Sequence, residues 1–380
     1  MRELVRMGHR GVILTSDSNH LGIAPQFEGS HKIDLIEGVE FCWIKSLKYG
    51  ETKSSRRILS WFDFEWRLWR LRKQQFGRPD AVIISSLSLL TIFNGLFLRW
   101  KHGCRLVFEI RDIWPLTMTE EGGYRKSNPF VIILGMIERL GYRRSDAVVG
   151  TMPKLGDHVA EVLGQRRAVH CIPMGVDEVA LTAGEPLDPE YEAKFIPRGK
   201  FIVCHAGSIG LTNALDTLLD CARALQDRSD IHFLIVGNGD LKAEYQKLCA
   251  DLPNVTFPPA VKKAMVQSLL SRCDLLYFST YKSKIWEFGQ SLNKVVDYML
   301  SGKPIVASYS GYPSMIDEAG CGSFVPARDV EALAKEILRY ADMPSECRAA
   351  MGHAGRKWLL HNRKYDVLAK NYLELMLPGR

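Results

Sequence analysis

Short apolar runs alternate with longer stretches in which apolar residues recur at helical spacing, almost throughout the chain. The short runs read as buried strands and the longer stretches as amphipathic helices. Strands separated by helices are typical of parallel sheets with right-handed crossovers, so two such sets predict two Rossmann-like α/β domains. The predicted strands are 11–15, 39–44, 81–84, 106–110 and 147–149, then 201–204, 232–236, 255–257, 275–278, 304–307 and 322–325.

The boundary between the two sets is expected in the Pro- and Gly-punctuated segment C-I-P-M-G-V-D at 171–177. A chain of 380 residues exceeds the size at which one core keeps growing, which also favours two domains. The predicted domains are 1–173 and 174–357, followed by a basic-aromatic helix over 358–380. Proteins of this kind bind ligands in the cleft between their domains.

Composition narrows the protein class. Apolar residues make up 46% and charged residues 24%, as in ordinary globular proteins. The nine cysteines form no C-x-x-C pair, which favours a reducing compartment and argues against a metal site. The first residues lack the apolar segment of a secretory signal, and no nucleic-acid module is recognisable.

Positive charge is concentrated in the first 150 residues, which hold 23 Lys and Arg against 16 Asp and Glu, a balance of 23 − 16 = +7. Within them, residues 53–78 are basic, aromatic and helical, and 97–101 repeat the character. Such segments suit an anionic membrane surface, the alternative being an aromatic stripe that faces the core. The uncharged run 81–98 is interpreted as a strand, a Ser-rich turn and a helix rather than a membrane span.

The stretch 289–320 combines a polar loop, a helix that ends at Gly302, a strand at 305–307 and a second loop that contains Gly311. Lys294 and Asp297 lie three residues apart on one helical face. A lysine holds phosphate and a carboxylate holds ribose hydroxyls, so this face suits a nucleotide. The alternative is a solvated helix pair.

Two other predicted strands end in residues that could bind a ligand, one in a glycine-rich loop and one in charged side chains. Gly207, Ser208, Ile209 and Gly210 follow a strand, where amides can approach a phosphate, whereas the similar loop 237–240 is equally well a plain turn. The strand 106–110 ends in Glu109, Arg111 and Asp112, groups that are costly to bury unless they face a cleft. Asp112 and Glu109 are predicted to orient an acceptor hydroxyl, although an Arg111–Asp112 ion pair that caps the turn is the alternative.

At residues 105–115 and 289–322 the chain resembles family 4 glycosyltransferases, which have the two-domain GT-B architecture with a cleft between the domains. The resemblance implies that Asp297 holds the ribose, that Lys294 meets the diphosphate, and that the Gly311 loop borders the donor. The S-L-N-K run, with Ser291 and Asn293, resembles a subgroup that builds bacterial surface polysaccharides such as O-antigen and capsule. Arg111 stands where other members have a sugar-contacting His, and Gly289 stands where many have a sugar-contacting Glu.

The resemblance further implies transfer of a sugar, such as an N-acetylated amino sugar, from a nucleotide diphosphate donor, UDP in the expected case, with retention. The implied acceptor is a polyprenyl-diphosphate-linked glycan, which places the enzyme in the cytoplasm, peripherally at the inner membrane face. No metal or other cofactor is expected, since there is no D-x-D triad and no His/Cys cluster. A UDP-sugar 2-epimerase of the same architecture and an inactive remnant remain alternatives.

Relatives usually begin with a strand and a glycine-rich loop, whereas this chain opens inside the helix that follows them, at R-E-L-V-R-M-G-H-R. The first domain is therefore expected to lack its central first strand, through a late start or a truncation. Without that strand, two sheet edges are expected to be unpaired.

Overall fold

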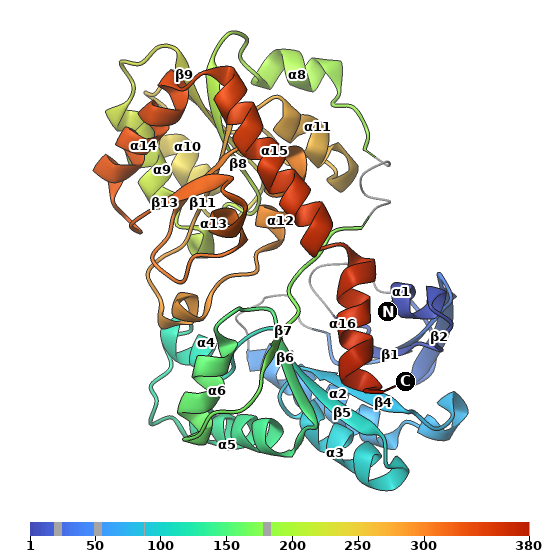
Figure 1. The fold of residues 1–380 in the computed structure, drawn as a ribbon. Helices are drawn as coiled ribbons and strands as arrows, with labels where there is room; N and C mark the ends of the chain where they lie inside the picture. The colour runs from blue at the N-terminus through green and yellow to red at the C-terminus, as the bar shows by residue number, and fades with distance from the viewer. Residues whose placement is uncertain (19–24, 49–54, 87, 178–183, 380) are drawn as a thin grey trace. The chain divides into compact units, whose positions relative to one another are not determined.

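The computed structural model describes residues 1–18, 25–48, 55–86, 88–177 and 184–379, which form two compact α/β units (Figure 1). Unit 1 comprises Met1–Thr151, Leu155–Ile172 and Asp366–Arg380. Unit 2 comprises Met152–Lys154 and Pro173–Tyr365. The prediction of an α/β fold with parallel sheets in two domains is confirmed.

Unit 1 contains two separate sheets. The first has the order β1-β3-β2, with β1 and β3 parallel and β2 antiparallel; the second is parallel with the order β4-β5-β6-β7. Among the described residues no strand joins the two sheets, and β1 and β4 are each an end strand of their sheet. The short or exposed strands β2 and β7 were not predicted. The strands are β1 (Val12–Ser16), β2 (His31–Ile36), β3 (Val39–Ile44), β4 (Ala81–Ser85), β5 (Arg105–Ile110), β6 (Ala147–Gly150) and β7 (His170–Cys171).

Helices cover both faces of the second sheet. On one face, Leu4 of α1 and Leu368 and Met376 of α16 pack with Val107 and Val149 of the strands. The chain rejoins unit 1 at Asp366 rather than at 358, because Trp358 packs against the core of unit 2. The helices of unit 1 are α1 (Arg2–Arg6), α2 (Ser55–Arg70), η1 (Lys73–Phe76), α3 (Thr91–His102), α4 (Leu116–Glu120), α5 (Pro129–Arg144), α6 (Leu155–Leu163) and most of α16 (Tyr365–Met376).

The run 81–98 divides into β4 and the first part of α3, as predicted. No helix among the described residues combines the length and apolar character that crossing a membrane requires.

Unit 2 is built on one parallel six-stranded sheet with the order β10-β9-β8-β11-β12-β13. Its four central strands, β8, β9, β11 and β12, are buried along almost their whole length because helices cover both faces, whereas the end strands β10 and β13 are mostly half-buried. All six strands were predicted. They are β8 (Phe201–Ala206), β9 (Ile231–Val236), β10 (Val255–Thr256), β11 (Leu275–Ser279), β12 (Ile305–Ser308) and β13 (Gly322–Val325).

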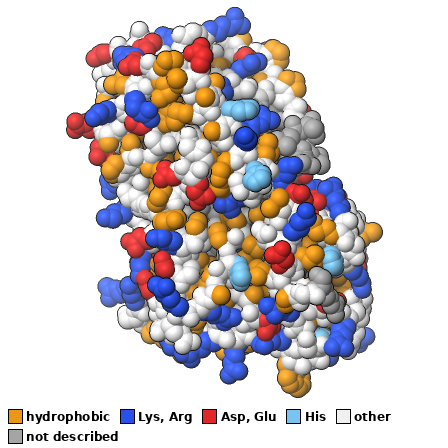
Figure 2. Space-filling model, in the orientation of Figure 1, with side chains coloured by type: hydrophobic (Ala, Val, Ile, Leu, Met, Phe, Trp, Pro, Cys, Tyr) orange, Lys and Arg blue, Asp and Glu red, His pale blue; other side chains and the backbone are white. Residues whose placement is uncertain are grey.

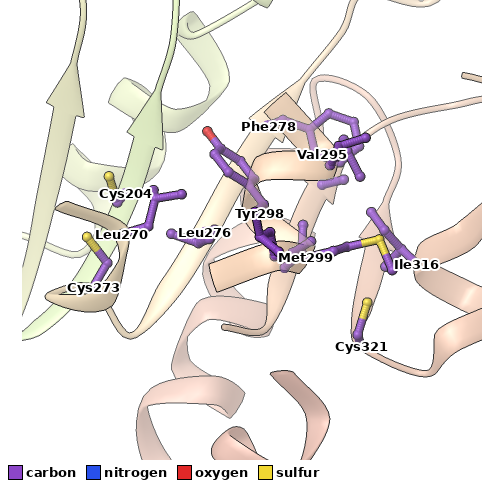
Figure 3. Close-up of a cluster of buried hydrophobic side chains, with 14 of the residues drawn as sticks. Cys204, Leu270, Cys273, Leu276, Phe278, Val295, Tyr298, Met299, Ile316 and Cys321 are labelled. Carbon is purple, nitrogen blue, oxygen red and sulfur yellow. The ribbon is translucent and has the colours of Figure 1, made fainter. Parts of the chain in front are cut away.

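The helix predicted in the stretch 289–320 is α12 (Asn293–Ser301). It ends at Gly302, whose φ of +72° is the left-handed C-cap that glycine favours. Val295 and Met299 of α12 pack into the same buried cluster as Phe278 of β11 and Ile316 of α13 (Figure 3). This packing fixes the first turn of α12 beside the carboxyl ends of the strands.

The other helices of unit 2 are mostly short. They are α8 (Pro189–Phe195), η2 (Leu211–Asn213), α9 (Asp216–Ala224), α10 (Lys242–Leu248), η3 (Lys263–Met265), α11 (Val266–Ser271), η4 (Lys284–Phe288), α13 (Met315–Ala319), α14 (Val330–Asp342) and α15 (Ser345–Asn362).

Candidate functional site

Two glycine loops meet at the carboxyl ends of β8 and β9. A Cβ at Gly237 would lie 1.8 Å from the carbonyl oxygen of Gly207, and one at Gly239 would lie 2.0 Å from that of Ile209. Only glycine allows this approach, so the loop 237–240 is more than a plain turn. The loop 237–240 packs directly against the backbone of residues 207–210.

The contact between the two loops also engages two of the four backbone N–H groups of residues 207–210, which the sequence analysis assigned to a phosphate. The N–H groups of Gly207 and Ile209 donate to the carbonyls of Val236 and Asn238, each at 2.9 Å, and the Ile209 side chain is buried in the core. These two N–H groups are therefore engaged within unit 2, and the prediction that all four residues contact a ligand stays a prediction. No hydrogen bond joins the amides of Ser208 and Gly210 to another described residue.

Lys294 extends from the first turn of α12 to these loops. Its ammonium donates a hydrogen bond to Oδ1 of Asn213, whose Nδ2 donates to the carbonyl of Ser208 at 2.9 Å. A Cβ placed on Gly207 would stand 3.7 Å from Nζ of Lys294. Among the described residues no ion pair with a carboxylate is formed by this ammonium, and no carboxylate contributes to its pKa. Burial lowers the pKa of Lys294 to about 8, so the charge is held in a poorly solvated place.

His205 lies directly beneath, fully buried at the end of β8, with Nε2 3.3 Å from the carbonyl of Ser208. Burial, and then the neighbouring charge of Lys294, lower the pKa of His205 to about 3. The imidazole is therefore neutral at any working pH and adds no charge to the loop. Lys294 is left as the cation of this cluster.

Asp297 lies one turn further along α12 and is about a quarter exposed. Its carboxylate accepts hydrogen bonds from Nζ of Lys263 at 2.5 and 2.7 Å. Lys294 and Asp297 thus contact partners from different elements, η2 and η3, rather than each other. Asn293 begins the helix with an exposed side chain.

The pair between Asp297 and Lys263 is a surface ion pair, because the lysine side chain is 76% exposed. Such pairs contribute at most about 1 kcal/mol. We expect Lys263→Ala to change the affinity for a nucleoside diphosphate less than about fivefold, and Asp297→Asn to weaken it at least tenfold, as measured by isothermal titration calorimetry. Equal losses in both variants would show that Asp297 acts through its lysine partner.

Two predicted donor residues, Ser291 and Gly311, have structural partners. Ser291 Oγ accepts from the amide of Met174 at 3.1 Å and so fixes the chain just after the domain boundary. Gly311 packs so closely that a Cβ would lie 2.4 Å from both the Trp286 carbonyl and the Tyr309 hydroxyl oxygen. These contacts fix the conformation of the loops. They account for Ser291 and Gly311 without a ligand.

Gly289, the position of the family glutamate, lies in the left-handed region at φ +107°. A Cβ there would be 2.5 Å from Cδ of Pro153. Residues 152–154 follow β6 but belong to unit 2, where the amide of Lys154 donates to the carbonyl of Phe288 at 2.9 Å. Glycine at 289 is therefore required by the loop that packs on it.

In unit 1 the predicted acidic and basic residues sit at the end of β5. Glu109 accepts a hydrogen bond from the hydroxyl of Tyr372 on α16. Arg111 and Asp112 are exposed, and their amides donate to the buried Oγ of Ser86 at 3.0 and 3.4 Å. Glu109 is thus hydrogen-bonded to α16. Arg111 and Asp112 lie with exposed side chains on a turn whose backbone is fixed by Ser86.

The carboxyl of Glu121 lies near this turn. Its pKa is raised, first by burial and then by the charge of Asp112. A cluster of carboxylates at the end of β5 is able to accept hydrogen bonds from hydroxyl groups of an acceptor.

Comparison with known proteins matches each half of the chain to a glycosyltransferase family. The family description "Glycosyl transferase 4-like domain" matches residues 1–175, and "Glycosyl transferases group 1" matches residues 200–342. No curated protein matches the sequence.

Solved structures share the whole architecture at low identity. Sucrose-phosphate synthase from Thermosynechococcus elongatus has a TM-score of 0.74 and 17% identity, covering 98% of this chain and 90% of its own. WaaG, a glycosyltransferase involved in lipopolysaccharide biosynthesis, has a TM-score of 0.64 and 15% identity over 100% and 95%. Anabaena HepE in complex with UDP has a TM-score of 0.63 and 14% identity over 89% and 86%. At these identities the likeness shows the fold.

Proposed function

The chain belongs to the GT-B glycosyltransferases of the family 4-like type, and from this premise we propose that it transfers a sugar from UDP to a lipid-linked glycan with retention. The observation that carries the donor assignment is Lys294, a half-buried ammonium beside the 207–210 loop with no carboxylate of the described residues against it. An unneutralised cation in a poorly solvated place is stabilised by an anionic ligand. A diphosphate supplies that charge.

The remaining roles in the proposal follow from position. Asp297 holds the ribose, and the amides of Ser208 and Gly210 meet the diphosphate together with Lys294 as negative charge grows on the leaving group. Arg111 and Asp112 act on the acceptor side, with Glu109 in support through Tyr372. No metal or cofactor is needed, because Lys294 and the amides supply the electrostatic stabilisation.

The proposed acceptor is a polyprenyl-diphosphate-linked glycan of a bacterial surface polysaccharide, with the enzyme cytoplasmic and peripheral at the inner membrane face. Three features support this: the S-L-N-K run, the positive balance of the first 150 residues, and the fold shared with WaaG, a protein of lipopolysaccharide biosynthesis. An N-acetylated amino sugar is the proposed transferred group.

The decisive experiment is a panel of UDP-sugars incubated with lipid-linked acceptors and followed by mass spectrometry. We expect an acceptor-dependent gain of one sugar and release of UDP. Conversion of a UDP-sugar without acceptor would identify a 2-epimerase instead. Absence of any thermal stabilisation by UDP would identify an inactive remnant, since a ligand that binds only the folded state raises its melting temperature.

UDP affinity should depend on pH through Lys294. The ammonium is charged below its pKa of about 8 and loses its charge as pH rises through that value, so UDP binding should weaken above pH 8. The limiting loss is about tenfold per pH unit. Calorimetry across the alkaline range tests this. Lys294→Arg keeps its charge and should flatten the profile, and it also corrects for titration of the uracil ring. Equal slopes in the two proteins would contradict the assignment.

A further inference from the structure

Seven large apolar side chains on α2 and α3 of unit 1 are exposed, Trp100 to 80% and Trp66 to 54%. We call them the aromatic face: Leu59, Phe62, Trp66 and Trp69 of α2, and Phe93, Phe97 and Trp100 of α3. Contiguous apolar surface of this kind marks a site of interaction.

The face is continuous and follows one side of each helix. Its α2 members recur every three or four residues, which aligns them in a single stripe. The rings of Trp69 and Phe97 lie 5.2 Å apart and join the two helices, and Trp100 lies 6.0 Å from Phe97. The alternative that these aromatics face the core is therefore wrong, because Leu68 and Glu65 occupy the buried side of α2.

Cations surround the aromatic face. The guanidinium of Arg70 lies 4.7 Å from the Trp66 ring, and the ammonium of Lys101 lies 5.9 Å from the Phe97 ring. Arg56 is also exposed on α2, and Lys53, from the same basic segment, lies outside the described residues. Figure 2 shows Lys and Arg side chains along the outer edge of unit 1 with hydrophobic side chains between them.

The acidic residues of the two helices do not offset this charge. α3 contains neither Asp nor Glu. On α2, Asp63 is paired with Arg67 at 2.9 Å, and Glu65 is buried, where it accepts hydrogen bonds from Ser88 and Thr91. Burial raises the pKa of Glu65, which further weakens its charge. The surface is therefore apolar in its middle and positive at its rim.

We propose that the aromatic face docks on the surface of an anionic lipid bilayer. Trp and Phe rings suit the boundary between headgroups and acyl chains, while Arg and Lys reach lipid phosphates from beside them. The purpose of the contact, access to a lipid-linked acceptor, rests on the proposed function, but the contact itself does not.

A second copy of the chain is the other occupant to consider. A two-fold interface on this face would bring the same patch of both copies together. The basic residues of one copy, which include Arg56, Arg70 and Lys101, would then face the equally basic patch of the other, with no unpaired exposed carboxylate on α2 or α3 to offset them. Anionic lipid has the complementary charge, and each basic residue near such a surface is worth roughly fivefold in binding.

Vesicle sedimentation with the full chain tests the proposal without any sugar transfer. We expect binding to phosphatidylglycerol–phosphatidylcholine vesicles and little binding to phosphatidylcholine alone. The double variant Trp66→Ser, Trp100→Ser should bind the anionic vesicles at least tenfold more weakly, and Arg70→Gln, Lys101→Gln at least tenfold more weakly at low salt. Circular dichroism and UDP affinity should be unchanged, which separates failure here from failure of the proposed function.

The matched control uses the exposed apolar side chains of α5, in the variant Ile132→Ser, Met136→Ser. It should sediment with anionic vesicles as the unmodified protein does. Loss of binding in this variant alone would overturn the proposal, as would unchanged binding of the Trp variant. Ultracentrifugation without lipid that shows a dimer dissolved by the Trp substitutions would assign the face to a second copy.

Discussion

Lys294→Met should lower kcat/KM with the correct UDP-sugar by about a hundredfold or more and leave the fold intact. Loss of one preorganised electrostatic group costs this much where charge develops in the transition state. Methionine nearly matches the length of the lysine stem, so the packing of α12 is kept. Steady-state kinetics with the donor identified by the panel measures the effect.

The same substitution should raise the melting temperature of the unliganded protein. Burial lowers the pKa of Lys294 from its ordinary value of 10.5 to about 8, so the charged form is unfavourable in the folded state. That cost is fully present below pH 8 and is relieved as pH rises toward 10.5. The expected gain is on the order of 1 kcal/mol at neutral pH and should shrink in alkaline solution. A less stable variant, or normal turnover, would contradict the role of Lys294 as a ligand cation.

Gly289→Glu, which installs the residue that many relatives carry, should inactivate the protein instead of improving it. The backbone is in the left-handed region, and the new Cβ would overlap Cδ of Pro153. Strain and overpacking together are expected to cost about 2–4 kcal/mol. The hydrogen bond between Lys154 and Phe288 would be displaced with the loop. Thermal unfolding and transfer activity report both effects.

Gly199→Glu is the matched control, since Gly199 also has a positive φ, +70°, but a Cβ there would meet nothing within 4 Å. It should show only the smaller loss from backbone strain, with normal transfer. A Gly289→Glu variant that is as stable as this control and more active than the unmodified protein would contradict the prediction. It would show that the loop 152–154 can shift to accommodate a glutamate at this position.

Most of the fold was predictable because burial on both faces gives parallel strands a near-continuous apolar pattern. The central strands β8, β9, β11 and β12 were found this way. α12 was found because its apolar spacing and terminal Gly302 are typical of a helix. β2 was missed because it is largely exposed, and β7 because it is only two residues long. Neither strand carries the signal of burial.

The candidate site was predicted only where its chemistry lies within one element. Lys294 and Asp297 could be paired by helical spacing, but their partners Asn213 and Lys263 lie 81 and 34 residues away, and no local spacing links them to α12. The engagement of the Gly207 and Ile209 amides depends on the second glycine loop, whose close approach no local pattern shows. The requirement for glycine at 289 likewise arises from Pro153, on a loop in the other half of the sequence.

The position of α16 has a consequence for how the chain folds during synthesis. Domains usually fold in the order in which they leave the ribosome. Here Leu368, Ala369 and Met376 complete the core beside Val107 and Val149, so the core of unit 1 cannot close until α16 has been made. Unit 2 ends at Tyr365 and is complete sooner. Unit 1 therefore begins before unit 2 in the sequence but is completed after it, and the apolar face formed by Val107 and Val149 stays uncovered until α16 has been made.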